Sequence, residues 1–292
     1  KNFKKELNIA INNKTLFISD NLGYLYSYDQ VSRRVLWAKN TKIPFRSNLK
    51  IKGDRIYTSN QNNDLLIFNK NTGDIIKQIP TEQTIIKNSF KNIIVLDEKK
   101  TIFFLNSYGS LYAIDSEFLE IKWFINLNQN LDFNPSNLFL SNQIIYNQKK
   151  IIISTNYSTY FIDTEIGSII YKNNFTTKLR PIINNNYLFL VTKNNFLVSI
   201  DLIEKKVLFS RDIDNAVSQF LNINKKKVQL KSLMLVNNNL YVLLKNSYLL
   251  IFNINGELKK IERLKNKVYS DPIIIDNSLI YLDNKNRIVV QN

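Results

Sequence analysis

The residue types that most often carry catalysis or bind metals are absent or scattered in this chain. Its 292 residues include neither cysteine nor histidine. Without thiols there is no disulfide framework, zinc–thiolate site or cysteine nucleophile, and without imidazole the commonest general base and metal ligand are missing. The acidic residues that stand out occur singly in predicted turns: Glu117, Glu120, Asp132, Glu165 and Asp212. This pattern favours a protein with no catalytic residues, no cofactor and no metal ion. A carboxylate-dependent enzyme remains an alternative, since carboxylates that pair across a fold leave no local pattern.

Positive charge is the second feature with a chemical meaning. The chain has 40 Lys and Arg against 24 Asp and Glu, a net charge of +16, which is typical of proteins that bind nucleic acid or anionic surfaces. The lysines are spread along the whole chain, however, and the longest run, Lys225–Lys227, lies in an insertion-like segment. Tyr and Phe fall mostly inside apolar runs, where they serve the core. We therefore expect a solvated basic surface, with polyanion binding as an alternative function.

One sequence unit recurs along the chain. Each copy begins with a polar residue or glycine, continues with an apolar, β-rich run and closes with Asp or Asn. The seven closing residues are Asp29, Asn69, Asp115, Asp163, Asp201, Asn253 and Asn292. Their spacing of 38 to 52 residues fits a four-stranded antiparallel unit, which needs about 40 to 45 residues.

The residues around each copy predict the other strands of the unit. A second apolar run precedes the copy, as at 15–19 and 101–106, and short polar turns such as Asp20–Gly23 join the two runs as hairpins. Units this small must stack to bury both faces, as the blades of a β-propeller do. We expect one all-β propeller domain over residues 1–292. The expected blades are 7–38, 49–79, 91–125, 140–172, 181–211, 231–262 and 271–292, with longer loops at 126–139 and 212–230.

Two copies of the repeat carry a more specific pattern. Gly23–Asp29 is followed by Leu36 and Trp37, and Gly109–Asp115 is followed by Trp123. This pattern resembles the repeat of the quinoprotein-like, or PQQ-repeat, β-propellers, and the chain is similar over nearly its whole length to the BamB-like family among them.

The other copies differ at the tryptophan position. Copies four and five have Tyr171 and Phe209, and copies two and six have Lys. We expect the aromatic side chains at this position to pack against the neighbouring blade rather than to bind a ligand.

The resemblance implies a non-catalytic protein-binding scaffold that assists the assembly of β-barrel proteins into the outer membrane. The implied partner is a BamA-like outer-membrane assembly factor, and the implied location is the periplasm at the inner face of the outer membrane, with a lipid anchor upstream of this chain. A quinoprotein-like dehydrogenase is the alternative within the same resemblance. Those enzymes carry a Ca²⁺ site and adjacent cysteines, and this chain has no cysteine.

The segment Lys42–Ser47 resembles the Arg-bearing interblade loop by which the family docks its partner. The resemblance implies that Pro44, Phe45 and Arg46 bind a partner outside the core, with Arg46 paired to a carboxylate and Phe45 as an apolar anchor. The alternative for Arg46 is a structural role at a strand end. The family's acidic motif on the next loop is reduced to one carboxylate in Thr81–Thr84.

The ends of the chain carry a further expectation. BamB-like chains usually have eight blades, so seven units imply a smaller propeller or an additional blade upstream. The seventh unit ends at Asn292 with its third strand. We expect residues 1–6 to supply the fourth strand of that sheet.

Overall fold

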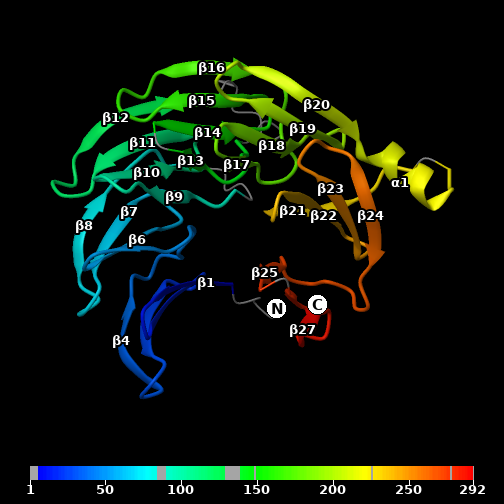
Figure 1. Cartoon of the computed structure of the whole chain (residues 1–292). Coiled ribbons are helices and arrows are strands. Elements are labelled where there is room, and N and C mark those ends of the chain that lie inside the picture. Colours follow the sequence, from blue (N-terminus) through cyan, green and yellow to red (C-terminus); the bar gives the residue numbers. More distant parts are fainter. Residues whose placement is uncertain are drawn as a thin grey trace. The chain divides into compact units, whose positions relative to one another are not determined.

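The computed structural model describes residues 6–83, 90–128, 139–147, 149–224, 226–276 and 278–291. Within these ranges the chain forms seven sheets, each made of strands that follow one another in sequence (Figure 1). Six sheets have four strands, and the last has three. The seven predicted blades of a β-propeller are confirmed. A closing strand is expected from residues 1–6, of which residues 1–5 lie outside the described residues, so this expectation stays a prediction.

The chain divides into two compact units, of which unit 1 comprises residues 1–156 and 160–171. It holds the first three sheets and most of the fourth. The first two sheets are β1 (Leu7–Asn12), β2 (Thr15–Asp20), β3 (Tyr24–Asp29) and β4 (Arg34–Asn40), then β5 (Lys50–Lys52), β6 (Arg55–Ser59), β7 (Leu65–Asn69) and β8 (Ile75–Ile79). The next two are β9 (Ile93–Leu96), β10 (Thr101–Leu105), β11 (Ser110–Asp115) and β12 (Ile121–Asn126), then β13 (Ile145–Asn147), β14 (Lys150–Ser154), β15 (Thr159–Asp163) and β16 (Ile169–Asn173).

Unit 2 comprises residues 157–159 and 172–292 and holds the last three sheets. The first two are β17 (Ile182–Asn184), β18 (Tyr187–Val191), β19 (Phe196–Asp201) and β20 (Lys206–Asp212), then β21 (Leu230–Val236), β22 (Asn239–Leu244), β23 (Tyr248–Asn253) and β24 (Leu258–Arg263). The third is β25 (Ile273–Ile275), β26 (Ser278–Leu282) and β27 (Ile288–Gln291). The single domain expected over residues 1–292 stays a prediction.

An Asp or Asn at the end of each described third strand but the last shapes the turn that follows it. The Asp115 carboxylate accepts hydrogen bonds from the backbone N–H groups of Glu117 at 2.8 Å and Phe118 at 3.1 Å. The same kind of acceptor role belongs to Asp29, Asn69, Asp163, Asp201 and Asn253. These side chains stabilise the turns because Asp and Asn can hydrogen-bond the backbone two or three residues on, and in the turn after Asn69 the side chain acts together with a glycine of positive φ, Gly73.

A bulge in the fourth strand of several blades precedes the position of the repeated aromatic residue. The register against the third strand shifts between Val35 and Trp37 in β4, and between Ile121 and Trp123 in β12. A bulge of this kind turns the next side chain to a new direction. In unit 2 the same shift precedes Phe209 in β20.

These aromatic rings lie on glycines of the next blade. The Trp37 indole N–H donates to the backbone oxygen of Lys70 at 3.1 Å, and a Cβ built on Gly73 would lie 2.5 Å from the Trp37 ring. A Cβ built on Gly167 would likewise lie 2.5 Å from the Trp123 ring, and one built on Gly256 would lie 2.6 Å from the Phe209 ring. The expected packing of this aromatic position against the neighbouring blade is therefore confirmed at three blades.

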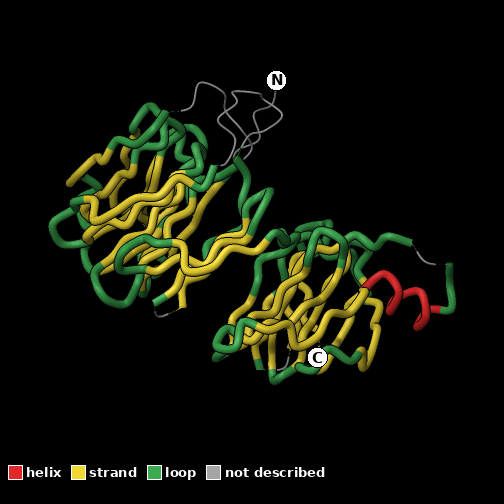
Figure 2. The backbone as a smooth tube through the Cα atoms, turned by 90° about the horizontal axis from the view of Figure 1, so that it is seen from above, coloured by secondary structure: helices red, strands yellow, loops and turns green. Residues whose placement is uncertain are grey.

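The prediction of a loop at 212–230 is wrong for part of this range. Residues Ile213–Leu221 form helix α1, which Figure 2 shows in red. The Asp212 side chain accepts from the N–H of Asn215 at 3.0 Å and so caps the first turn. Ile213 and Val217 are buried, so the helix is held by packing on one side. Most of the other expected loop, residues 129–138, lies outside the described residues.

We expect Gly73→Ala to destabilise the protein more than Gly53→Ala. Both glycines have a positive φ, +73° and +57°, so both substitutions carry a backbone cost of about 1–2 kcal/mol. No atom lies within 4 Å of a Cβ at Gly53, whereas at Gly73 the Trp37 ring must move, which adds about 1–3 kcal/mol. Urea unfolding midpoints measure the difference. In a Trp37→Ala background the excess should vanish; an excess that survives there would show that another contact requires the glycine.

Candidate functional site

The segment between β4 and β5, where sequence analysis places the partner-binding residues, is fixed by backbone hydrogen bonds on both sides. The N–H of Arg46 donates to the backbone oxygen of Ser59 at 2.8 Å, and the backbone oxygen of Arg46 accepts from the N–H of Asn92 at 2.9 Å. One blade lies on each side of it, because Ser59 ends β6 and Asn92 precedes β9. The segment therefore has a preformed shape.

Phe45 belongs to the core, which corrects the expectation that it lies outside. Its side chain is 3% exposed and packs in one cluster with Phe17, Leu25 and Phe68. The Phe45 and Phe68 rings meet edge to face with centroids 6.1 Å apart, a favourable aromatic geometry. Phe45 therefore anchors the segment to its own blade. The signal against an exposed role is its position in an apolar pair of residues, Ile43 and Phe45, that alternates as in a buried strand.

Pro44 and Arg46 are half-buried and keep part of their surface exposed. Burial lowers the pKa of the Arg46 guanidinium from its ordinary value, and the group still carries its charge at neutral pH. A partly desolvated guanidinium attracts a carboxylate more strongly than a fully solvated one, because the local dielectric constant is lower.

Glu82, the single carboxylate on the next loop, is bonded within the protein. Its carboxylate accepts from Ser110 Oγ at 2.8 Å, from Asn106 Nδ2 at 3.0 Å and from the hydroxyl of Tyr112. Burial raises the pKa of Glu82, but the hydrogen bonds from Tyr112, Ser110 and Asn106 outweigh it, so the pKa lies below its ordinary value. The Tyr112 pKa is raised, by burial and by this carboxylate.

A chain of buried amides connects the Glu82 loop to the Arg46 segment. The Asn63 side chain donates to the backbone oxygen of Glu82 at 2.7 Å, and its Oδ1 accepts from Asn92 Nδ2 at 3.1 Å. Asn92 in turn bonds the backbone of Arg46. No local sequence pattern indicates this network, because Asn63 and Asn92 are single residues on different blades. Both loops are therefore parts of one rigid polar region in unit 1.

The scattered acidic residues have local structural partners. Glu117 pairs with Lys100 at 2.5 Å, Glu165 lies 3.8 Å from Lys99, and Asp212 caps α1. The backbone oxygen of Glu120 accepts from the N–H of Asp115 at 2.8 Å. Asp132 lies outside the described residues.

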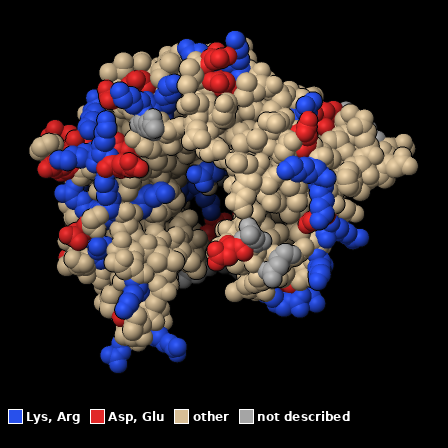
Figure 3. Space-filling model, in the orientation of Figure 1, with Lys and Arg blue, Asp and Glu red and all other residues tan. Residues whose placement is uncertain are grey.

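The described part of the chain has neither a cluster of acidic metal ligands nor a helix suited to span a membrane. No three acidic side chains there gather closely enough to hold a metal ion. No helix in the same ranges has the length and apolar character needed to cross a membrane. Figure 3 shows Lys and Arg side chains over many parts of the visible face, with Asp and Glu between them.

Comparisons with known proteins give one family. The model of the family described as "Outer membrane protein assembly factor BamB" matches residues 3–211. The crystal structure of BamB from Moraxella catarrhalis superposes with a TM-score of 0.76 at 13% identity, covering 98% of this chain and 83% of that one. A computationally designed protein, Ika8, gives a TM-score of 0.71 at 8% identity with the same two coverages. No curated protein sequence matches this chain.

We expect Glu82→Gln to destabilise the protein at neutral pH by about 1–3 kcal/mol, because an amide leaves part of this donor set unsatisfied. The folded-state pKa of Glu82 is lowered, so its contribution is full above the ordinary value of 4.5 and is lost as pH falls through the folded pKa. The difference between wild type and variant should therefore shrink at acid pH. Urea unfolding at pH values on either side of this range measures it.

Glu117→Gln is the matched control, since Glu117 forms an exposed pair with Lys100 that is worth about 0–1 kcal/mol. Equal losses for the two variants at neutral pH would contradict a special role for the Glu82 network.

Proposed function

Because the chain belongs to the family of the outer membrane protein assembly factor BamB, we propose that it is a non-catalytic scaffold that holds partner proteins during assembly of β-barrel proteins into the outer membrane. The observation that carries this proposal is the family match over residues 3–211, together with the seven-bladed propeller architecture. A propeller presents many loops on a rigid frame, and binding residues concentrate on such loops. The proposed location is the periplasm, at the inner face of the outer membrane.

The proposed partner-binding group is Arg46, with Pro44 beside it. A carboxylate on a BamA-like assembly factor would receive two parallel N–H bonds from the guanidinium. The backbone bonds to Ser59 and Asn92 support this assignment, because a preformed segment loses little conformational entropy when it binds. The buried Phe45 contributes by holding the segment in place rather than by touching the partner.

The Glu82 network bears on how the partner is held. In this chain the one carboxylate of the second loop is bonded to Ser110, Asn106 and Tyr112. A basic group on the partner would therefore have to compete with three internal donors. We propose that this chain contributes the positive charge at the contact, through Arg46, and that the partner contributes the negative charge.

We expect Arg46→Glu to weaken binding to a purified BamA-like assembly factor by about 2–5 kcal/mol, because the change places like charges together in a partly buried contact. Surface plasmon resonance with the partner immobilised measures the dissociation constants. Arg34→Glu is the matched control: it makes the same charge change at an exposed position in β4. A melting temperature near that of wild type for both variants separates binding from folding. Unchanged binding by a folded Arg46→Glu protein would refute the assignment.

A further inference from the structure

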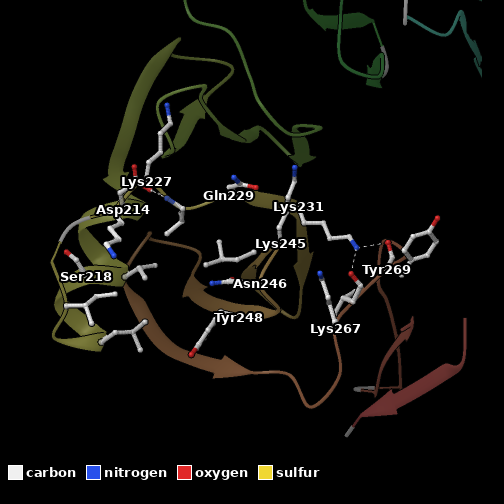
Figure 4. A pocket seen from close by; sticks show the side chains of 17 residues that line it. Asp214, Ser218, Lys227, Gln229, Lys231, Lys245, Asn246, Tyr248, Lys267 and Tyr269 are labelled. Atoms are coloured by element: carbon white, nitrogen blue, oxygen red, sulfur yellow. Dashed lines mark hydrogen bonds between the residues drawn. The ribbon is translucent and has the colours of Figure 1, made fainter. Parts of the chain in front are cut away.

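Unit 2 contains a pocket of about 760 Å³ that has no part in the site proposed around Arg46. Figure 4 shows its lining side chains. They come from α1 and the loop after it, from β21, from the hairpin of β22 and β23, and from the segment that leads to β25. This volume is in the range of ordinary ligand sites, about 300–1,000 Å³. All of its lining residues lie beyond residue 211, outside the part of the chain that the family model matches.

The lining of the pocket is strongly basic. Among its 17 residues are five lysines and one acidic residue, Asp214, a larger excess of positive charge than the 40 to 24 ratio of the chain. The five lysines are Lys226, Lys227, Lys231, Lys245 and Lys267. They come from four separate positions along the chain, so the fold, rather than a run of adjacent lysines, brings them together.

Two charged side chains of the lining, Asp214 and Lys231, are hydrogen-bonded within the protein. The Asp214 carboxylate accepts from Asn195 Nδ2 at 2.8 Å and from the N–H of Val228 at 2.9 Å. Lys231 donates to the backbone oxygens of Val268 at 2.7 Å and Tyr269 at 2.6 Å, and Figure 4 marks these bonds. Asp214 and Lys231 therefore hold the walls of the pocket together.

The other four lysines are exposed, and none of them has an ion-pair partner among the residues that the structure describes. Their charge acts on a neighbour: the pKa of Lys178 is lowered by burial and further by Lys227 and Lys245. An anion bound here would relieve this repulsion. The pocket is therefore electrostatically suited to a ligand with negative charge.

Apolar side chains supply the rest of the lining. Val217, Leu244 and Val268 are buried in the floor, whereas Ile223 and Tyr269 are 52% and 60% exposed. Exposed apolar groups beside unpaired lysines favour a ligand that is both anionic and apolar. A single phosphate or a free inorganic anion would leave this apolar surface in water.

We propose that the pocket binds an acidic peptide segment of a partner protein, with carboxylates at the lysines and aliphatic or aromatic side chains on the apolar lining. Lysines from separate segments require anionic groups that are spaced along the ligand, as they are along an extended peptide. A lipid headgroup offers one anionic point. A single-stranded nucleic acid would need a series of aromatic side chains as stacking platforms along a basic groove. The apolar lining here has six aliphatic side chains against two tyrosines, Tyr248 and Tyr269, which favours aliphatic side chains on the ligand.

Fluorescence anisotropy with the full chain tests the proposal, using a short labelled peptide that alternates glutamate and leucine. Two further peptides replace glutamate with glutamine, or leucine with glycine. The test variant is Lys227→Glu/Lys245→Glu. The matched control is Lys259→Glu/Lys285→Glu, which makes the same charge change at exposed lysines of unit 2 outside the pocket. The melting temperatures of both variants are measured alongside.

The expected result is binding of the glutamate–leucine peptide that is weakened at least about tenfold by the test variant and much less by the control. Both altered peptides should bind more weakly than the parent. If both variants weaken peptide binding equally, the effect is one of net charge and the proposal is overturned. Unchanged peptide binding by the test variant would overturn it as well. The proposal would also be overturned if phosphatidylglycerol vesicles or DNA bound more tightly than the peptide and this binding depended on Lys227 and Lys245. If the test variant melts well below the control, the single variants Lys227→Gln and Lys245→Gln replace it, with the same criteria.

Discussion

The contact of an aromatic ring in one blade with a left-handed glycine in the next is the constraint on which blade packing depends. The three contacts are Trp37 with Gly73, Trp123 with Gly167, and Phe209 with Gly256. In each the glycine has a positive φ that L-residues rarely adopt, and the ring occupies the space where a Cβ would stand. Each such contact therefore needs two features that are distant in sequence: a bulge that directs the ring toward the next blade, and a glycine turn in that blade that leaves space for the ring. The two tryptophans add a hydrogen bond from the indole to the same turn.

The intervening blade shows that the constraint is one of filled volume. In β8 the equivalent position after the bulge is Lys77, which does not fill the space. The turn of the next blade then has Leu119 in place of glycine, with φ of 58°, and this side chain is buried with Tyr57 and Ile67 of the preceding blade. Strain at a left-handed leucine is offset by the burial of its side chain. The space between blades is filled from one side or from the other, so the repeat tolerates the loss of an aromatic residue.

The sequence predicts those features that repeat with the blade and misses those that do not. Closing Asp and Asn residues are recognisable because each turn needs the same acceptor at the same place. Helix α1 occurs once, although its cap Asp212 and the apolar pair Ile213 and Val217 are a helical signal within the segment where a loop is expected. Burial of Phe45 and the convergence of lysines around one pocket depend on tertiary contacts between separate segments, which no local pattern contains.

Strand order explains why both candidate sites are built from the same kinds of loop. In a four-stranded antiparallel blade, the turn between strands three and four lies at one end, and this end is occupied by the aromatic–glycine contacts. The turn between strands two and three lies at the other end, beside the connection to the next blade. In unit 1 the N–H of Thr41 bonds the backbone of Gly23 in this way, and in unit 2 the N–H of Val268 bonds Ser247 Oγ. Arg46 belongs to such a connection, and Lys245 and Lys267 to such a turn and connection. The charged groups of both proposed sites therefore lie on turns and connections at the end of the blades away from the aromatic–glycine contacts.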